Sequence, residues 1–225
     1  MNRENLLAHA EQVEIPGITG HLSGDLIIPE NASALVIFAH GSGSSRLSPR
    51  NQYVASILQE HNLATLLFDL LTPEEEILDS ETRVYRFDID LLTKRLISAT
   101  DWILRKKSLR KFKLGYFGAS TGAASAIRAA VLRPRFVQAV VSRGGRPDLA
   151  GVALSQLQVP TLMIVGGLDS RVIQLNAEAF ERIPADKKRL EIIPGATHLF
   201  EEPGTLDAAA QHAASWFETY LARTS

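Results

Sequence analysis

The segment that most limits how this chain can fold is residues 118–122, Gly-Ala-Ser-Thr-Gly, which fit the pattern G-x-S-x-G. An apolar run at 114–117 precedes it and an alanine-rich run reaching Pro134 follows it, so the pattern falls between a predicted buried strand and a predicted helix. At such a junction the pattern indicates a nucleophile elbow, a turn so sharp that the Ser120 side chain projects above the sheet. The flanking glycines are needed because larger side chains would collide with the neighbouring strand and helix. The alternative is an ordinary loop between strand and helix.

The composition and charge of the chain exclude several classes of protein. Its 225 residues are 45% hydrophobic and 22% charged, which is ordinary for a soluble globular protein, and we expect one domain over residues 1–225. The formal net charge of −1 argues against a nucleic-acid partner bound through bulk electrostatics. Because the chain has no cysteine, disulfides, thiolate metal sites and cysteine nucleophiles are excluded.

The sequence contains no pattern typical of a targeting or membrane segment. The first residues lack the apolar stretch of a secretory signal, and no apolar run approaches the roughly 20 residues that span a bilayer. We therefore expect a cytoplasmic protein without a membrane partner.

Apolar runs and helical patterns alternate along the chain. Buried strands are predicted at 34–39, 63–67, 114–117, 137–141, 161–165 and 189–193, after two short antiparallel edge strands within 11–30. Helices are predicted at 49–61, 88–106, 171–182 and 205–222. The acidic segment 72–82 is expected to be a solvated loop, since no histidine accompanies its carboxylates to make a metal site. This alternation predicts an α/β fold, with a mainly parallel sheet of about eight strands flanked by helices.

Three polar residues follow the ends of predicted parallel strands: Ser120, Asp169 and His198. The carboxyl ends of such strands meet at one edge of the sheet, so the three side chains are expected to lie together. A serine hydroxyl is a poor nucleophile at neutral pH and needs a base beside it. An imidazole takes and returns a proton near neutrality, and a carboxylate holds the ring in the correct tautomer. The chain order serine, acid, histidine is that of the α/β-hydrolases.

Each of these residues also has a simpler structural interpretation. The alternative for His198 is a loop histidine that caps a backbone group. For Asp169 it is an N-cap of the helix predicted from 171. Asp148, which follows the preceding strand, is the reserve candidate for the acid.

An oxyanion formed during attack by Ser120 needs two backbone N–H donors. One is expected from Thr121, the residue after the nucleophile, and the other from Ser42, with Gly43 the next choice. The glycines on both sides of Ser42 let the backbone turn its amide inward. A phosphate cradle is the alternative for this loop, but the pattern G-x-x-x-x-G-K-[ST] is missing from the sequence. We expect His40 to brace the loop through hydrogen bonds.

Four separated motifs together resemble the α/β-hydrolase superfamily. They are HGSG at 40–43, GASTG at 118–122, GLD at 167–169 and GATH at 195–198. Within the superfamily, a short chain without a large cap insertion resembles the dienelactone-hydrolase-like branch. The resemblance implies an α/β-hydrolase fold with no large cap domain. Dienelactone hydrolases proper use a cysteine nucleophile and Ser120 stands in its place here, so the family's substrate does not carry over.

Arginines near the predicted site bear on what the substrate carries. Arg46 and Arg50 follow the oxyanion loop, and Arg143 and Arg146 follow the strand next to the elbow strand. An arginine fork suits a carboxylate or a phosphate, so Gly43, Arg46, Arg143 and Arg146 are candidate substrate contacts. The alternative is that these arginines pair with nearby acids or face solvent.

The residues together favour a serine hydrolase of small carboxylic esters, lactones or thioesters that works through an acyl-enzyme. No insertion is long enough for a lid domain, and segment 72–87 is the one candidate for a small flap, which favours a small-molecule acyl substrate. We expect no cofactor and no metal. Two alternatives stay open: acyl transfer by the same residues to a nucleophile other than water, and a non-catalytic binding protein with a hydrolase fold.

Overall fold

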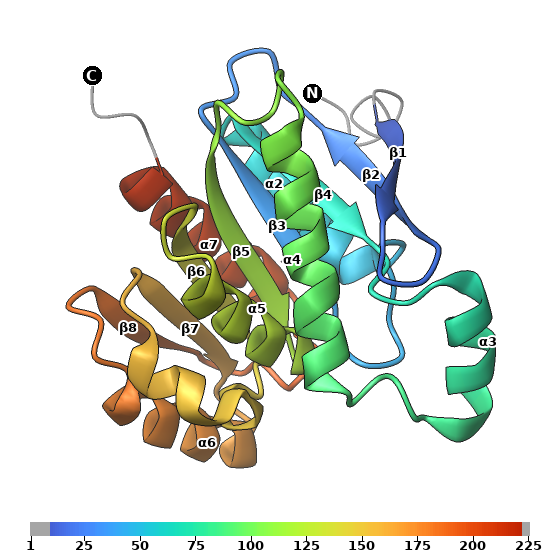
Figure 1. The fold of residues 1–225 in the computed structure, drawn as a ribbon. Coiled ribbons are helices and arrows are strands. Elements are labelled where there is room, and N and C mark those ends of the chain that lie inside the picture. The colour runs from blue at the N-terminus through green and yellow to red at the C-terminus, as the bar shows by residue number, and fades with distance from the viewer. Residues whose placement is uncertain (1–9, 222–225) are drawn as a thin grey trace.

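The computed structural model describes residues 10–221 and contains an eight-stranded sheet with the order β1-β2-β4-β3-β5-β6-β7-β8 (Figure 1). The strands are β1 (Glu11–Pro16), β2 (His21–Ile27), β3 (Ala34–Ala39), β4 (Leu63–Phe68), β5 (Lys113–Ala119), β6 (Val137–Arg143), β7 (Thr161–Gly166) and β8 (Lys188–Ile193). β2 runs antiparallel to β1 and to β4, whereas all the other neighbouring pairs are parallel. The predicted mainly parallel sheet of about eight strands is confirmed. Of the two strands predicted to be antiparallel edge strands, β1 lies at the edge, but β2 does not, because it pairs with β1 on one side and with β4 on the other.

Helices cover both faces of this sheet (Figure 1). One face carries α4 (Ile89–Arg105), α5 (Thr121–Leu132), the 3₁₀ helix η1 (Pro147–Gln156) and α6 (Ser170–Arg182), and the other carries α2 (Pro49–Glu60) and α7 (Thr205–Leu221). Each face buries its own hydrophobic cluster, and β3 and β4 are buried along their whole length. Within residues 10–221, no helix is both long and apolar enough to cross a membrane.

Two of these helices begin at N-caps that the sequence makes recognisable. The Ser48 side chain accepts a hydrogen bond from the N–H of Asn51, and a proline occupies the first turn of α2. Asp88 Oδ1 accepts from the N–H of Leu91 at 2.9 Å, at the start of α4. Such caps satisfy N–H groups that have no partner inside the helix and contribute about 1 kcal/mol each.

The prediction of a loop over 72–82 is wrong, because residues Pro73–Thr82 form helix α3. The Thr72 side chain accepts from the N–H of Glu75, and the Glu75 carboxylate accepts from the Thr72 N–H, which is a complete capping box. The acidic first turn suits the positive end of the helix dipole. Glu75 also pairs with the fully buried Arg95 at 2.6 Å, and this contact ties α3, which projects from one side of the body in Figure 1, to α4.

Candidate active site

The elbow has the geometry that its sequence predicts. Ser120 lies between β5 and α5 with φ 50° and ψ −121°, a backbone conformation that few non-glycine residues adopt. A Cβ atom on Gly122 would lie 2.1 Å from the carbonyl oxygen of Ala39, and one on Gly118 would lie 2.5 Å from Cα of Ala123. The two glycines are therefore required by the close approach of neighbouring backbone.

Asp169 and His198 come together beyond the ends of β7 and β8. His198 Nδ1 lies 2.6 Å from Asp169 Oδ2, and the other carboxylate oxygen of Asp169 accepts from the N–H of Val172 at 3.4 Å. Asp169 is thus both the N-cap of α6 and the partner of the imidazole, so the two interpretations of this residue hold at once. The hydrogen bond of the cap fixes the orientation of the carboxylate, and the carboxylate in turn fixes the orientation and the tautomer of the imidazole.

Ser120 and His198 both line one cavity of about 240 Å³. Its lining also includes Gly41, Ser42, Asn51 and Arg143 among other residues. Ser120 is partly exposed and the His198 side chain is 40% exposed, so both are open to a small molecule. Within the described residues no hydrogen bond joins the two side chains; in hydrolytic sites this contact commonly tightens only when the substrate is bound.

Two glycines that the sequence analysis did not single out shape the surroundings of His198. Gly144, with φ +53°, lies against the imidazole: a Cβ there would lie 3.6 Å from its Cε1 and Nδ1. A Cβ on Gly166 would lie 2.5 Å from the carbonyl oxygens of Ala196 and Thr197, so this glycine admits the loop that carries His198. The sequence signal was a Gly-Gly pair at the end of each strand, at 144–145 directly after β6 and at 166–167 where β7 ends.

The loop expected to supply the second oxyanion donor is a tight turn. The N–H of Ser44 donates to the carbonyl of Gly41 at 3.2 Å, and Gly43 has φ +66°, as the third residue of a type II turn requires. The N–H of Ser42 donates to the Thr121 hydroxyl at 2.9 Å. The Ser42 amide therefore lies next to Thr121, the residue after Ser120, as expected. In this structure, however, its N–H donates to the Thr121 side chain.

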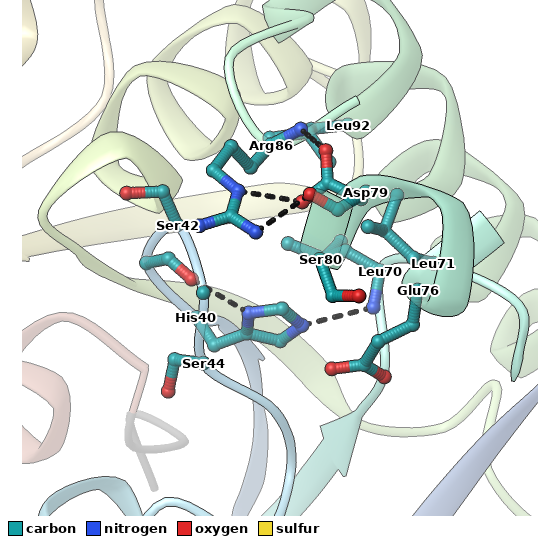
Figure 2. Close-up of a pocket in the computed structure, with 12 residues that line it drawn as sticks. His40, Ser42, Ser44, Leu70, Leu71, Glu76, Asp79, Ser80, Arg86 and Leu92 are labelled. Atoms are coloured by element: carbon teal, nitrogen blue, oxygen red, sulfur yellow. Dashed lines mark hydrogen bonds and ion pairs between the residues drawn. The ribbon is translucent and has the colours of Figure 1, made fainter. Parts of the chain in front are cut away.

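His40 braces this loop from below, and that prediction is confirmed. Its Nδ1 lies 2.9 Å from the carbonyl oxygen of Gly41, and its Nε2 accepts from the N–H of Leu70 at 3.0 Å (Figure 2). These contacts require the neutral ring with the proton on Nδ1. Burial lowers the pKa of His40, which favours the same neutral form. His40 is therefore a structural link between β3 and the segment after β4.

A second cavity of about 240 Å³ lies on the other side of loop 41–44, beneath α3. Figure 2 shows Arg86 reaching over it toward Ser42, held by Asp79, whose carboxylate it contacts at 2.6 Å. The predicted substrate contact Gly43 lines this cavity, and a Cβ there would lie 3.3 Å from the Arg86 guanidinium. Between residues 10 and 221, no cluster of three or more histidine and carboxylate side chains is arranged to hold a metal ion.

Two of the predicted arginine contacts are paired with acids of the protein. Arg46 contacts Asp69 and lies 3.3 Å from Asp25. Arg146 makes two hydrogen bonds to Asp148, at 2.9 and 2.7 Å. Asp148 is thus committed to Arg146, and the carboxylate that the structure places on His198 is Asp169.

The third predicted arginine, Arg143, differs from the other two. It is only 8% exposed, and its Nη2 donates to Asn51 Oδ1 at 3.2 Å. Its guanidinium lies 5.8 Å from the ring centre of Phe117 and 5.9 Å from that of Phe200. Burial first, and then the neighbouring charge of Arg50, lower the pKa of Arg143 to about 10, so the group is still a cation at neutral pH.

A sharp strand-to-helix turn that presents a serine, with a carboxylate–imidazole pair at the same edge of a mainly parallel sheet, defines an α/β-hydrolase. A crystal structure of dienelactone hydrolase from Anabaena variabilis ATCC 29413 is 55% identical to this chain, covers 95% of it and 99% of its own length, and has a TM-score of 0.91. The chain belongs to the dienelactone-hydrolase-like branch of the superfamily. Est1E from Butyrivibrio proteoclasticus, solved with ferulic acid, is 15% identical over 94% of this chain and all of its own, with a TM-score of 0.78, and that likeness shows the fold alone.

One curated relative is longer than this chain, and its name gives a transferase activity. The Mycobacterium tuberculosis (strain H37Rv) protein called "Putative phosphoribosyl transferase Rv0571c" is 51% identical over 211 residues, which are 94% of this chain and 46% of that protein. The chain therefore spans about half the length of the curated relatives it matches first. No family model matches the sequence.

Proposed function

We propose that this protein is a serine hydrolase of small carboxylic esters, lactones or thioesters. The observation that carries the proposal is the Asp169–His198 pair at 2.6 Å, on the same cavity as the elbow serine Ser120. The name of the dienelactone hydrolase that is 55% identical to this chain supports hydrolysis as the reaction class. The cavity of about 240 Å³ is below the usual range for drug-sized ligands and favours a short acyl group.

In the proposed reaction, Ser120 Oγ attacks the substrate carbonyl while its proton passes to Nε2 of His198. The bond to the leaving group then breaks, and the imidazolium returns the proton to the departing alcohol or thiol. Water enters next: His198 takes its proton, the hydroxide attacks the acyl-enzyme, and Ser120 recovers its proton as the acid leaves. Asp169 stabilises the transient imidazolium throughout.

The oxyanion is proposed to bind the N–H groups of Thr121 and Ser42. The Ser42 amide is bonded to the Thr121 hydroxyl in the free protein, so the oxyanion must displace this acceptor. Exchange of a neutral hydroxyl for an anion is favourable, since hydrogen bonds to charged acceptors are roughly twice as strong as neutral ones. The Gly43 amide is the second choice for this donor.

The relative's name raises phosphoribosyl transfer as a rival activity. That name belongs to a protein of about twice this length, and we propose that the present chain corresponds to a hydrolytic half of it.

The acyl-transfer alternative differs only in which nucleophile reaches the acyl-enzyme, so added hydroxylamine in the ester assay would reveal it as hydroxamate formation.

The decisive test is Ser120→Ala, with Ser98→Ala on the exposed side of α4 as the matched control. Turnover of 4-nitrophenyl acetate and labelling by a fluorophosphonate probe should both be lost in the first variant, with turnover falling about 10⁴-fold. Both should be unchanged in the second. Ester turnover that survives the loss of the Ser120 hydroxyl would exclude the mechanism, and an unlabelled, inactive wild type would favour the binding-protein alternative.

A further inference from the structure

The positive charges of this chain are concentrated in one stretch of the sequence. Residues 102–147 contain eleven of the 24 lysines and arginines and none of the 25 aspartates and glutamates. The densest part is residues 105–113, where six of nine side chains are cationic. Because the whole chain has a formal net charge of −1, the rest of the chain is correspondingly acidic. Charge is therefore segregated along this sequence.

The fold gathers the densest of these charges at the edge of the sheet opposite to Ser120. Residues 105–111 lead from the end of α4 into β5, and residues 132–136 lead from the end of α5 into β6, the parallel neighbour of β5. Two hydrogen bonds from Arg133 to Asp101, at 3.0 and 2.8 Å, hold the second segment against the last turns of α4. We call these two segments together the basic edge.

Six cations of the basic edge are exposed, and within residues 10–221 none of the six forms an ion pair. They are Arg105, Lys106, Lys107, Arg110, Lys111 and Arg135. Elsewhere in the same acid-free stretch, Arg128 contacts Asp90 and Arg146 is bonded to Asp148. A simpler interpretation is that the six are solvated cations at the ends of two helices, where positive charge suits the helix dipole. That interpretation leaves the apolar groups among them unexplained.

Large apolar side chains are exposed on the basic edge. Leu132 is 57% exposed and Phe136 is 43% exposed, and both line a shallow hollow of about 330 Å³ together with Pro134 and Arg135. That volume is at the lower end of the range for ligand sites, so the hollow can take aliphatic side chains of a partner. Exposed apolar groups rimmed by charged residues mark an interaction site. The complementary surface would carry carboxylates around large apolar residues.

Helix α3 of the same chain presents such a surface. Four of its residues are exposed at helical spacing and share one face: Glu74, Ile77, Leu78 and Glu81. Ile77 is 69% exposed and Leu78 is 45% exposed, so the apolar part of this face has no partner among residues 10–221 that buries it. The acids that hold α3 in place, Glu75 and Asp79, lie on a different face, where they contact Arg95 and Arg86.

A chain cannot place its own α3 on its own basic edge. α3 lies at the first turn of α4 and the basic edge begins at the last, so the whole of α4 separates them (Figure 1). The 17 residues of α4 span about 26 Å. The ion pair between Glu75 and the fully buried Arg95, at 2.6 Å, also fixes α3 to α4. A contact between the two surfaces therefore requires another molecule.

We propose that the exposed face of α3 docks on the basic edge of a second copy of this chain, with its two apolar residues against the hollow and its two acids against the cations. None of the residues of either surface lines the cavity of Ser120 and His198, so this inference does not depend on the proposed function. Because the two surfaces differ, a two-fold pair makes the contact twice, and a head-to-tail series makes it once per copy.

Sedimentation equilibrium of the wild-type protein is the first test. The weight-average mass should rise above that of one chain at about 100 µM protein in about 50 mM NaCl, and fall towards it in about 500 mM NaCl, because salt screens exposed charges. A mass of one chain at the higher protein concentration and low salt would overturn the proposal. Binding of that monomer to duplex DNA or to phosphatidylglycerol vesicles would then assign the basic edge to another partner.

A charge exchange tests which surfaces are in contact. One variant is Lys107→Glu with Arg110→Glu, and the other is Glu74→Lys with Glu81→Lys. Each variant alone should associate at least about tenfold more weakly than wild type, because like charges then face each other. An equal mixture of the two should associate as strongly as wild type, since every contact between unlike variants again joins opposite charges.

The matched control is Arg171→Glu with Arg182→Glu, two exposed residues of α6. It changes the net charge as the first variant does and should associate like wild type. Thermal melts within about 2 °C of wild type should show that all three variants are folded. If the folded charge variants associated like wild type, or if their mixture stayed as weak as each alone, α3 and the basic edge would not be the surfaces in contact.

Discussion

Gly144→Ala tests whether catalysis depends on how closely the backbone approaches the imidazole. Gly144 has φ +53°, and an added Cβ would lie 3.3 Å from the His198 carbonyl oxygen and 3.6 Å from two ring atoms. Alanine in this left-handed region costs about 1 kcal/mol of folding free energy. Relief of the 3.3 Å contact requires the His198 segment to move by a few tenths of an ångström. Since a 1 Å misplacement can cost 10²-fold in rate, we expect turnover to fall about tenfold.

The matched control is Gly20→Ala, in the turn between β1 and β2. Gly20 has φ +68°, and a Cβ there would meet only the Thr72 methyl at an ordinary 3.7 Å. Thermal melts should show both variants lowered by about 2–4 °C, because the backbone strain is the same. Steady-state turnover of 4-nitrophenyl acetate should fall in Gly144→Ala alone. If the two variants had equal turnover, the contact between Gly144 and His198 would not position the base.

Three further outcomes follow from contacts of the same site. Asp169→Asn should lower ester turnover about 10⁴-fold by favouring the wrong imidazole tautomer, yet keep the melting temperature, since asparagine caps helices as well as aspartate. Thr121→Val removes the acceptor of the Ser42 N–H, so denaturant unfolding should show a loss of about 1 kcal/mol, while turnover stays within threefold because the oxyanion meets no competing acceptor. Burial lowers the pKa of His40, so the unfolded chain binds this proton more readily. The free energy of unfolding should therefore fall below pH 6.5, by up to about 1.4 kcal/mol per pH unit, and His40→Gln should flatten that slope in urea titrations at pH 7 and 5.

The sequence sufficed for those parts of the fold that depend on local patterns. Short apolar runs predicted the parallel strands, and their order placed Ser120, Asp169 and His198 at one edge of the sheet. The charge of residues 74–76 suggests a solvated loop, whereas the proline after Thr72 and the capping box at Thr72 and Glu75 indicate helix α3. Local chemistry at the start of a helix is a stronger indicator than net charge, since the acidic residues of a first turn themselves stabilise it.

The partners of three arginines could not all be predicted from the sequence pattern. Arg46, Arg143 and Arg146 each fall a few residues after the end of a predicted strand, and the sequence offers the same two interpretations for all three. What separates them is whether tertiary structure brings a carboxylate within reach. For Arg146 the partner, Asp148, is two residues away and was foreseeable. For Arg46 it is Asp69, the residue after β4, and only the neighbouring positions of β3 and β4 in the sheet bring it close. Arg143 ends between two aromatic rings and a cavity, where the fold supplies no acid within ion-pair distance among the described residues, and no sequence pattern separates this outcome from that of Arg46.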